Sequence, residues 1–300
     1  MRKVLVISGM TATGKSSAAI QMAKRFNGEI ISADSVAVYR ECTIGSAKIL
    51  PHEQEGIPHH LIDTLSYREK YSVKAFQQDA KALIESISER GKLPIIVGGT
   101  GLYIRALLWD YPLKDEEPRS TEHLDALSNE QLYQKLCDED REAANVIHIN
   151  NRKRLLRALI RYESQQADGH IEPQPEPQKC YDDYTLIFSH ERSVLYQSIN
   201  QRVRTMIDRG LEAEVRGLIR KDEDWHLQSM QAIGYREFQG YFAGEYNLEA
   251  LIELIQKNTR NFAKRQITWF KHQSDGQWVD MNEMTVEFLE KEIEAWLEKN

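Results

Sequence analysis

The stretch VISGMTATGKSSAA, at positions 6–19, constrains the fold more than any other part of the chain. It contains Gly9, Gly14, Lys15 and Ser16 in the Gly-x-x-x-x-Gly-Lys-Ser spacing of a phosphate-binding P-loop. The apolar run KVLVIS comes just before, as expected for a buried parallel strand. These features predict a strand, a glycine-rich turn and a helix in succession.

The predicted turn is suited to binding an anion. Backbone amides of such a loop face the ligand, and the N-terminus of the following helix adds its dipole. We expect Lys15 to reach the outer phosphates and Ser16 to bind Mg²⁺. The predicted phosphate-binding residues are Gly9, Met10, Thr11, Ala12, Thr13, Gly14, Lys15 and Ser16. In the helix, Ala19, Met22, Ala23 and Phe26 recur at the spacing of a buried face.

Strand and helix patterns alternate along the rest of the chain. Further strands are predicted in GEIISADS, LPIIVGG, DYTLIFSH and QWVDM. Amphipathic helices are predicted over 72–91 and 102–108, and another ends at Gly210. This alternation predicts an α/β fold of the P-loop NTPase-like type, with a parallel sheet flanked by helices.

Residues 115–180 interrupt this pattern. They show helical periodicity without a convincing strand, and they end in the proline-rich stretch HIEPQPEPQK, which we interpret as a hinge. The predicted organisation is therefore a first part of the core over 1–114, an all-helical insertion domain over 115–180, and a second part of the core over 181–300.

Several classes of protein are disfavoured. No run of eighteen apolar residues occurs, so we expect no membrane partner. The N-terminus lacks the pattern of a signal peptide, and the three cysteines are scattered, which favours a reduced, cytoplasmic location. His59 and His60 are adjacent but have no third ligand at zinc spacing, so we assign them a structural role rather than a metal site.

The P-loop alone does not identify its ligand. A GTPase would need Asn-Lys-x-Asp, which is absent. The strand LPIIV ends in Gly98 and Gly99, where many ATPases carry an acid. A small-molecule kinase that binds ATP remains possible, with Asp34 as the base. So does an RNA-binding protein that uses a nucleotide as a switch.

Longer motifs narrow the choice. They are GMTATGKS, ISADSVAVYR, IGSAKI, PHHLID, VGGTGLYIRALL, INQRVRTMIDRGLEAEV, QAIGYREF and TRNFAKRQITWF, and they extend in this order from position 9 to position 270. With them the chain resembles the bacterial tRNA dimethylallyltransferases, also called isopentenyl-diphosphate:tRNA transferases. The predicted insertion is the part that matches least.

The resemblance implies a reaction. N6 of adenosine 37, next to the anticodon in the anticodon stem-loop of tRNAs, attacks C1 of dimethylallyl diphosphate with Mg²⁺ present, giving isopentenyladenosine and pyrophosphate. Asp34, Arg202 and Thr11 are the implied catalytic residues, with Asp34 as the base. Asp34 could instead hold Mg²⁺ through water or cap a helix, and Arg202 could lie on the surface of an amphipathic helix.

The resemblance also implies contacts with tRNA, although the net charge of the chain is −7. Two local runs, 151–161 and 259–272, contain basic residues and no acid. The predicted tRNA-binding residues are Asp34, Ser35, Val36, Ala37, Thr100, Arg152, Lys153, Arg154, Arg157, Gln231, Gly234, Tyr235 and Arg236.

Simpler readings stay open for some of these. The basic helical face that includes Arg161 could be merely solvated, and Thr100 could be a helix N-cap. We expect Trp269 and Phe270 to belong to the core rather than to stack on RNA. Nothing such as a heptad pattern argues against a monomer.

Overall fold

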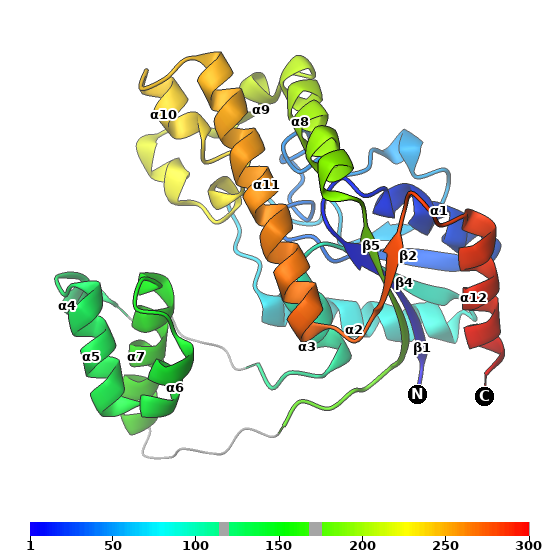
Figure 1. Cartoon of the computed structure of the whole chain (residues 1–300), viewed down its shortest axis with the longest axis horizontal. Coiled ribbons are helices and arrows are strands. Elements are labelled where there is room, and N and C mark those ends of the chain that lie inside the picture. Colours follow the sequence, from blue (N-terminus) through cyan, green and yellow to red (C-terminus); the bar gives the residue numbers. More distant parts are fainter. Residues whose placement is uncertain (114–119, 168–175, 300) are drawn as a thin grey trace. The chain divides into compact units, whose positions relative to one another are not determined.

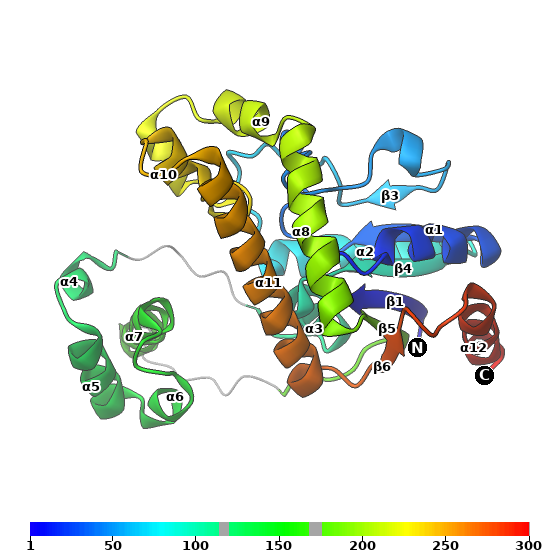
Figure 2. The ribbon, with the colours of Figure 1, turned by 45° about the horizontal axis from the view of Figure 1, so that its top comes forward.

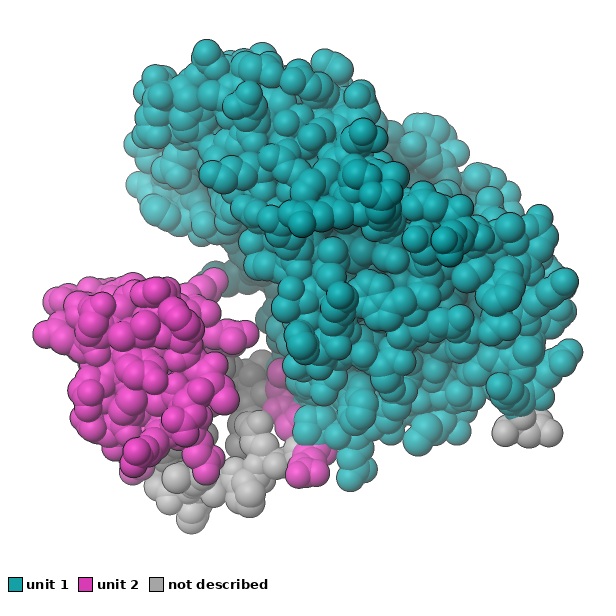
Figure 3. All heavy atoms as spheres, viewed as in Figure 1, with its two compact units in different colours: residues 1–111, 177–300 teal, residues 112–176 magenta. Residues whose placement is uncertain are grey.

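The computed structural model describes residues 1–113, 120–167 and 176–299. The chain forms two compact units (Figure 3). Unit 1 comprises Met1–Tyr111 and Pro177–Asn300, and unit 2 comprises Pro112–Glu176. The predicted boundary at 115 and the first part of the predicted hinge, 170–175, lie outside the described residues.

A six-stranded, entirely parallel sheet forms the centre of unit 1. Its strand order is β3-β2-β4-β1-β5-β6, and its strands are β1 (Lys3–Gly9), β2 (Gly28–Ser32), β3 (His59–His60), β4 (Leu93–Gly98), β5 (Asp182–Ser189) and β6 (Gln277–Asp280). The predicted parallel α/β architecture is confirmed. Sequence analysis missed β3, because a two-residue edge strand leaves no periodic pattern.

Helices cover both faces of this sheet (Figures 1 and 2). Val4 and Val6 of β1 pack in one cluster with α2 (Val73–Glu89) and α3 (Gly101–Leu108). The alternate residues Leu5 and Ile7 pack in a second cluster with α1 (Lys15–Arg25) and α12 (Val286–Glu298). Since side chains alternate across a strand, burial on both faces explains why β1 reads as a continuous apolar run.

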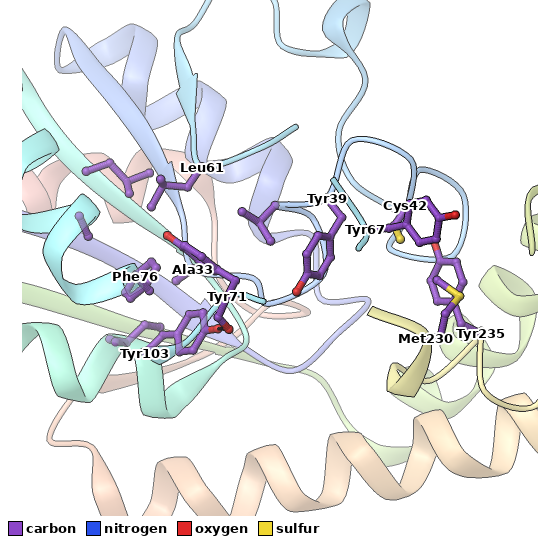
Figure 4. Close-up of a cluster of buried hydrophobic side chains, with 14 of the residues drawn as sticks. Ala33, Tyr39, Cys42, Leu61, Tyr67, Tyr71, Phe76, Tyr103, Met230 and Tyr235 are labelled. Atoms are coloured by element: carbon purple, nitrogen blue, oxygen red, sulfur yellow. Dashed lines mark hydrogen bonds between the residues drawn. The ribbon is translucent and has the colours of Figure 1, made fainter. Parts of the chain in front are cut away.

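The first cluster is rich in aromatic rings beside the carboxyl end of β2 (Figure 4). Phe76 stacks on Tyr103 with 4.6 Å between ring centroids, and Tyr71 meets Tyr103 edge-on. Tyr39 is fully buried, and its hydroxyl has no hydrogen-bond partner among the described residues. These rings give the loop after β2 a rigid support.

Two long helices of unit 1 pack against each other: α8 (Arg192–Asp208) and α11 (Leu248–Gln273) (Figure 2). The end of α8 is marked by Gly210 in a left-handed conformation (φ +96°), as predicted. α11 also contacts β1 and α3 and so reaches the P-loop side of the sheet. The remaining elements of this unit are α9 (Leu211–Leu218), α10 (Phe238–Phe242), η1 (Pro51–Glu53), η2 (Asp222–His226) and η3 (Ser229–Gln231).

Unit 2 is all-helical over its described residues. It contains α4 (Glu122–Asp125), α5 (Asn129–Glu139), α6 (Arg141–Val146) and α7 (Arg152–Ala167). Leu132, Leu136, Leu155 and Leu159 are fully buried in a core of its own. Across both units, no described helix combines the length and hydropathy that crossing a bilayer would require.

Candidate active site

The P-loop connects β1 to α1 through two glycines that no other residue could replace easily. Gly9 has φ +132°, and a Cβ placed there would lie 2.2 Å from the Phe188 carbonyl oxygen of β5. Gly14 has φ +80° and immediately precedes α1. Between them, the Thr13 hydroxyl donates to the Met10 carbonyl oxygen at 2.8 Å. The turn is therefore fixed by backbone packing before any ligand arrives.

Lys15 lies at the start of α1 and folds back over the loop, where its ammonium donates to the Met10 carbonyl oxygen. The pKa of Lys15 is lowered to about 7, mainly because the ammonium is buried; the charge of Arg202 adds to this lowering and the charge of Asp34 opposes it. The charged form of such a lysine is strongly stabilised when an anion binds, because the anion supplies the missing counter-charge.

Arg202 brings a second positive charge to the loop from α8. Its Nη1 donates to the Thr11 hydroxyl at 3.1 Å, and its Nη2 donates to the Ala47 carbonyl oxygen at 3.4 Å. Burial lowers the pKa of Arg202, and the nearby Asp34 charge opposes this shift. Arg202 also lines an open hollow of about 770 Å³ along α8, together with Gln197, Ser198, Asn200, Gln201, Arg204 and Thr205. Arg202 is therefore half-buried and hydrogen-bonded to the P-loop, rather than fully exposed on α8.

Asp34 follows the carboxyl end of β2. Its Oδ1 accepts hydrogen bonds from the backbone N–H groups of Val36 at 2.8 Å and Ala37 at 3.1 Å. These bonds cap a turn rather than a helix, and no described group donates to Oδ2. Because Asp34 acts electrostatically on both Lys15 and Arg202, the structure gathers one carboxylate and two cations at this edge.

The turn after β4 lies directly against the loop that bears Asp34. A Cβ at Gly98 would lie 2.2 Å from the Ala33 carbonyl oxygen, and the Thr100 N–H donates to that same oxygen at 3.3 Å. Thr100 occupies the N-cap position of α3, but its side chain makes no capping bond. Its hydroxyl thus remains available near Asp34.

The sequence of this chain is similar to those of known tRNA-modifying enzymes. The sequence pattern of the family described as IPP transferase matches residues 37–273. A tRNA dimethylallyltransferase from Macrococcus caseolyticus is 46% identical, covering 97% of this chain and 95% of the relative. One from Enterococcus faecalis is 44% identical, covering 100% and 99%. The chain belongs to the IPP transferase family.

Solved structures of the family agree with this fold. The tRNA isopentenylpyrophosphate transferase of Bacillus halodurans is 38% identical and covers 99% of this chain and 97% of its own, with a TM-score of 0.76. That of Staphylococcus epidermidis is 37% identical and covers 99% of both chains, with a TM-score of 0.73. A eukaryotic dimethylallyltransferase acting on tRNA is 30% identical, covering 94% and 74%, with a TM-score of 0.76.

Sequence analysis missed one side chain of this IPP transferase that contacts the P-loop directly. Gln266 of α11 accepts from the Thr11 N–H at 3.1 Å and donates to the Gly99 carbonyl oxygen at 3.0 Å. It was detectable in principle, because Ala263, Gln266 and Phe270 fall at the spacing of one helical face. A polar residue among buried apolar ones indicates that its side chain makes specific hydrogen bonds.

The predicted tRNA-binding segment 231–236 lies elsewhere in unit 1. Gln231 and Arg236 are exposed, and Gly234 is buried with φ +93°. Tyr235 is fully buried, with its hydroxyl donating to Glu214 at 2.7 Å, so its side chain is not accessible to RNA in this structure. Since Glu214 also accepts from the backbone N–H groups of residues 43–45, Tyr235 supports that loop.

The basic residues of α7 separate into two groups. Arg152 donates inward to the carbonyl oxygens of Leu124, Asp125 and Leu127, which ties α7 to the end of α4. These hydrogen bonds hold unit 2 together, and the predicted contact of Arg152 with tRNA stays a prediction. The side chains of Lys153, Arg154, Arg157 and Arg161 are exposed, and Arg161 lies 3.9 Å from Asp140.

Two residue pairs, His59 with His60 and Trp269 with Phe270, were predicted to have structural rather than binding roles. His60 contacts Glu29 at 2.8 Å, His59 contacts the Ile57 carbonyl oxygen, and no cluster of metal-binding side chains occurs among the described residues. Phe270 is buried, and Trp269 packs so closely on α3 that a Cβ at Gly101 would lie 2.3 Å from its ring. His59 and His60 therefore make structural contacts, and Phe270 lies in the core as predicted, whereas Trp269 is only half-buried.

The residues present are compatible with Mg²⁺. Ser16 is exposed at the beginning of α1, and its hydroxyl makes no hydrogen bond to a described residue. Mg²⁺ usually takes one or two protein oxygens and completes its octahedron with phosphate oxygens and water. A single serine hydroxyl beside a phosphate site is a sufficient protein contribution of that kind.

Proposed function

We propose that this IPP transferase transfers the dimethylallyl group of dimethylallyl diphosphate to N6 of adenosine 37 in the anticodon stem-loop of tRNAs. The products are isopentenyladenosine and pyrophosphate. The observation that carries the proposal is that Lys15 and Arg202 both donate hydrogen bonds to the P-loop, and that the charge of Asp34 acts on the pKa of each. Two half-buried cations suit a diphosphate. A single carboxylate, one oxygen of which accepts no hydrogen bond from a described residue, suits the removal of one proton.

The diphosphate binds in the P-loop, residues 9–16. As the bond from C1 to oxygen breaks, charge grows on the leaving pyrophosphate. Lys15, Arg202 and the Thr11 hydroxyl are already oriented by the fold, so they stabilise that charge without reorganising. Ser16 would hold Mg²⁺, which supplies further positive charge to the phosphate oxygens when bound.

Asp34 accepts the proton. The exocyclic amine of adenine is a weak nucleophile, and its N–H becomes acidic as the bond to C1 forms. Oδ1 is fixed by the amides of Val36 and Ala37, which holds Oδ2 in a defined position to accept the proton. Ser35, Val36, Ala37 and Thr100 line the approach of the adenine to Asp34.

The substrate base must leave its stack to reach Asp34, as enzymes that modify a base require. We propose that Lys153, Arg154 and Arg157 of α7 contact the RNA backbone, with further contacts from the exposed Gln231 and Arg236. The protein acts as a monomer in the cytoplasm, where its tRNA substrates are found. Light scattering of the purified protein checks the oligomeric state.

A direct assay tests the reaction. Purified protein is incubated with tRNA, dimethylallyl diphosphate and Mg²⁺ in the absence of ATP, and nucleosides are analysed by mass spectrometry. Isopentenyladenosine at position 37 is the expected product. A parallel reaction with γ-labelled ATP and no prenyl donor examines the kinase alternative. Phosphoryl transfer there, with no prenylated adenosine in the first reaction, would overturn the proposal.

A further inference from the structure

We infer that Gln266 is a positioning residue that fixes the distance between the leaving group and the acceptor nucleotide. The inference rests on the proposed function. Its basis is a pair of hydrogen bonds from one buried side chain to the two loops that form opposite ends of the site.

The contacts are specific to an amide. The Thr11 N–H can only donate and the Gly99 carbonyl can only accept, so Oε1 and Nε2 of Gln266 are assigned without ambiguity. Among side chains of this length, only glutamine accepts at one atom and donates at the other. The residue is 6% exposed, and a Cβ at Gly99 would lie 2.4 Å from Nε2. The fit therefore leaves no room for displacement.

Each partner of Gln266 leads to a reacting group. The Thr11 hydroxyl accepts a hydrogen bond from Arg202. The loop that Gln266 contacts at Thr11 is therefore the loop proposed to bind the leaving group. Gly99 precedes Thr100, whose N–H donates to the Ala33 carbonyl oxygen next to Asp34. Gln266 thus joins the diphosphate end to the base end through hydrogen bonds on both sides.

Alignment of this kind has a chemical consequence. When N6 is correctly placed, it forms the bond to C1 as pyrophosphate departs with the electron pair of the C1–oxygen bond. When the loops of Thr11 and Gly99 are no longer held at a fixed distance, N6 is misplaced and water can attack C1 instead. The water oxygen then bonds to C1 and releases a proton, giving dimethylallyl alcohol and pyrophosphate. The ratio of alcohol to isopentenyladenosine therefore measures alignment.

The test is Gln266→Met, which keeps the volume and removes both hydrogen bonds. Gln77→Met is the matched control, because Gln77 is also buried and donates to two backbone carbonyls, those of Ala106 and Tyr111. Both products are quantified from the same reaction, so the ratio does not depend on the fraction of folded enzyme. Misplacement by about 1 Å can cost roughly 10²-fold in rate. We expect the ratio to rise about tenfold or more in Gln266→Met and to stay at the wild-type value in Gln77→Met.

A second variant separates positioning from general damage. Gln266→Glu keeps an acceptor for Thr11 but cannot donate to Gly99 when ionised, and it adds negative charge beside the diphosphate. It should raise both the product ratio and the KM for dimethylallyl diphosphate, whereas Gln266→Met should mainly lower kcat. A wild-type ratio in both Gln266 variants, with prenylation continuing, would overturn this inference. Wild-type enzyme that makes no isopentenyladenosine would overturn the proposed function instead.

Discussion

The P-loop site of unit 1 and the basic face of α7 in unit 2 both present positive charge, but they hold it differently. At the P-loop, Lys15 and Arg202 come from distant parts of the sequence, and burial lowers the pKa of each. On α7, Lys153, Arg154 and Arg157 come from one helical segment and are exposed. Sequence composition does not separate these two arrangements; burial and long-range contacts do.

The difference predicts two kinds of response to mutation. Charges in a site of low effective dielectric constant interact strongly and are screened little by salt. Exposed charges are screened over about 8 Å at physiological ionic strength. Changes at the P-loop should therefore be large and nearly independent of salt. Changes on α7 should be small, additive and salt-dependent.

The largest effect is expected for Asp34→Asn. Asparagine keeps an oxygen that can accept from Val36 and Ala37 but cannot take a proton at neutral pH, so the loop should stay in place. Turnover under saturating substrates should fall by about 10²–10⁴, with dimethylallyl diphosphate binding retained. Single-turnover kinetics and calorimetry measure the two quantities. Turnover near the wild-type rate would exclude Asp34 as the base.

Arg202→Ala should come next. Removing one preorganised donor to a developing anion costs about 10²–10³ in rate. The loss should be similar at low and high salt, which distinguishes a buried group from a surface one. Arg209→Ala, an exposed change near the end of the same helix, provides the control. A loss in Arg202→Ala that disappears as salt is raised would place Arg202 with the α7 residues rather than with the P-loop.

A pH titration of ligand binding sharpens the same contrast. Lys15 has a pKa of about 7 in the free protein, and a bound diphosphate should raise it, so binding takes up a proton above pH 7. The association constant for dimethylallyl diphosphate should therefore fall between pH 7 and 9, by up to about tenfold per pH unit. Lys15→Met should bind more weakly and lose this decline. A wild-type affinity that stays constant over this range would contradict the assignment.

The smallest effect is expected on α7. Replacing Arg154 and Arg157 together by glutamine should weaken tRNA binding and spare dimethylallyl diphosphate binding. If each contacts one phosphate, the slope of log affinity against log salt should fall by about 0.7 per residue. Filter binding at several salt concentrations gives the slope. An unchanged slope would mean that this face of unit 2 is only solvated.

Sequence reasoning succeeded where a local pattern determines the structure. The P-loop, five of the six strands of the central sheet and the buried face of α1 each follow from spacing within a few residues. It failed where structure depends on distant partners. Nothing in the sequence distinguishes Glu214 from the other acidic residues. Only the structure shows that its carboxylate accepts hydrogen bonds from three backbone N–H groups of another loop. Arg152 looks like its basic neighbours in the sequence, and only the structure shows that it donates to carbonyl oxygens at the end of α4.

The order of strands in the sheet has a consequence for how the chain is made. β1 leaves the ribosome first, yet its partner β5 begins only at Asp182, after all of unit 2 has been synthesised. Until then one edge of an apolar strand has no neighbour, and such edges promote association between chains. Because synthesis proceeds at about 5–20 residues per second, this interval lasts on the order of ten seconds or more. We therefore expect nascent chains that stop before β5 to require chaperone protection, whereas unit 2 can fold as soon as it emerges.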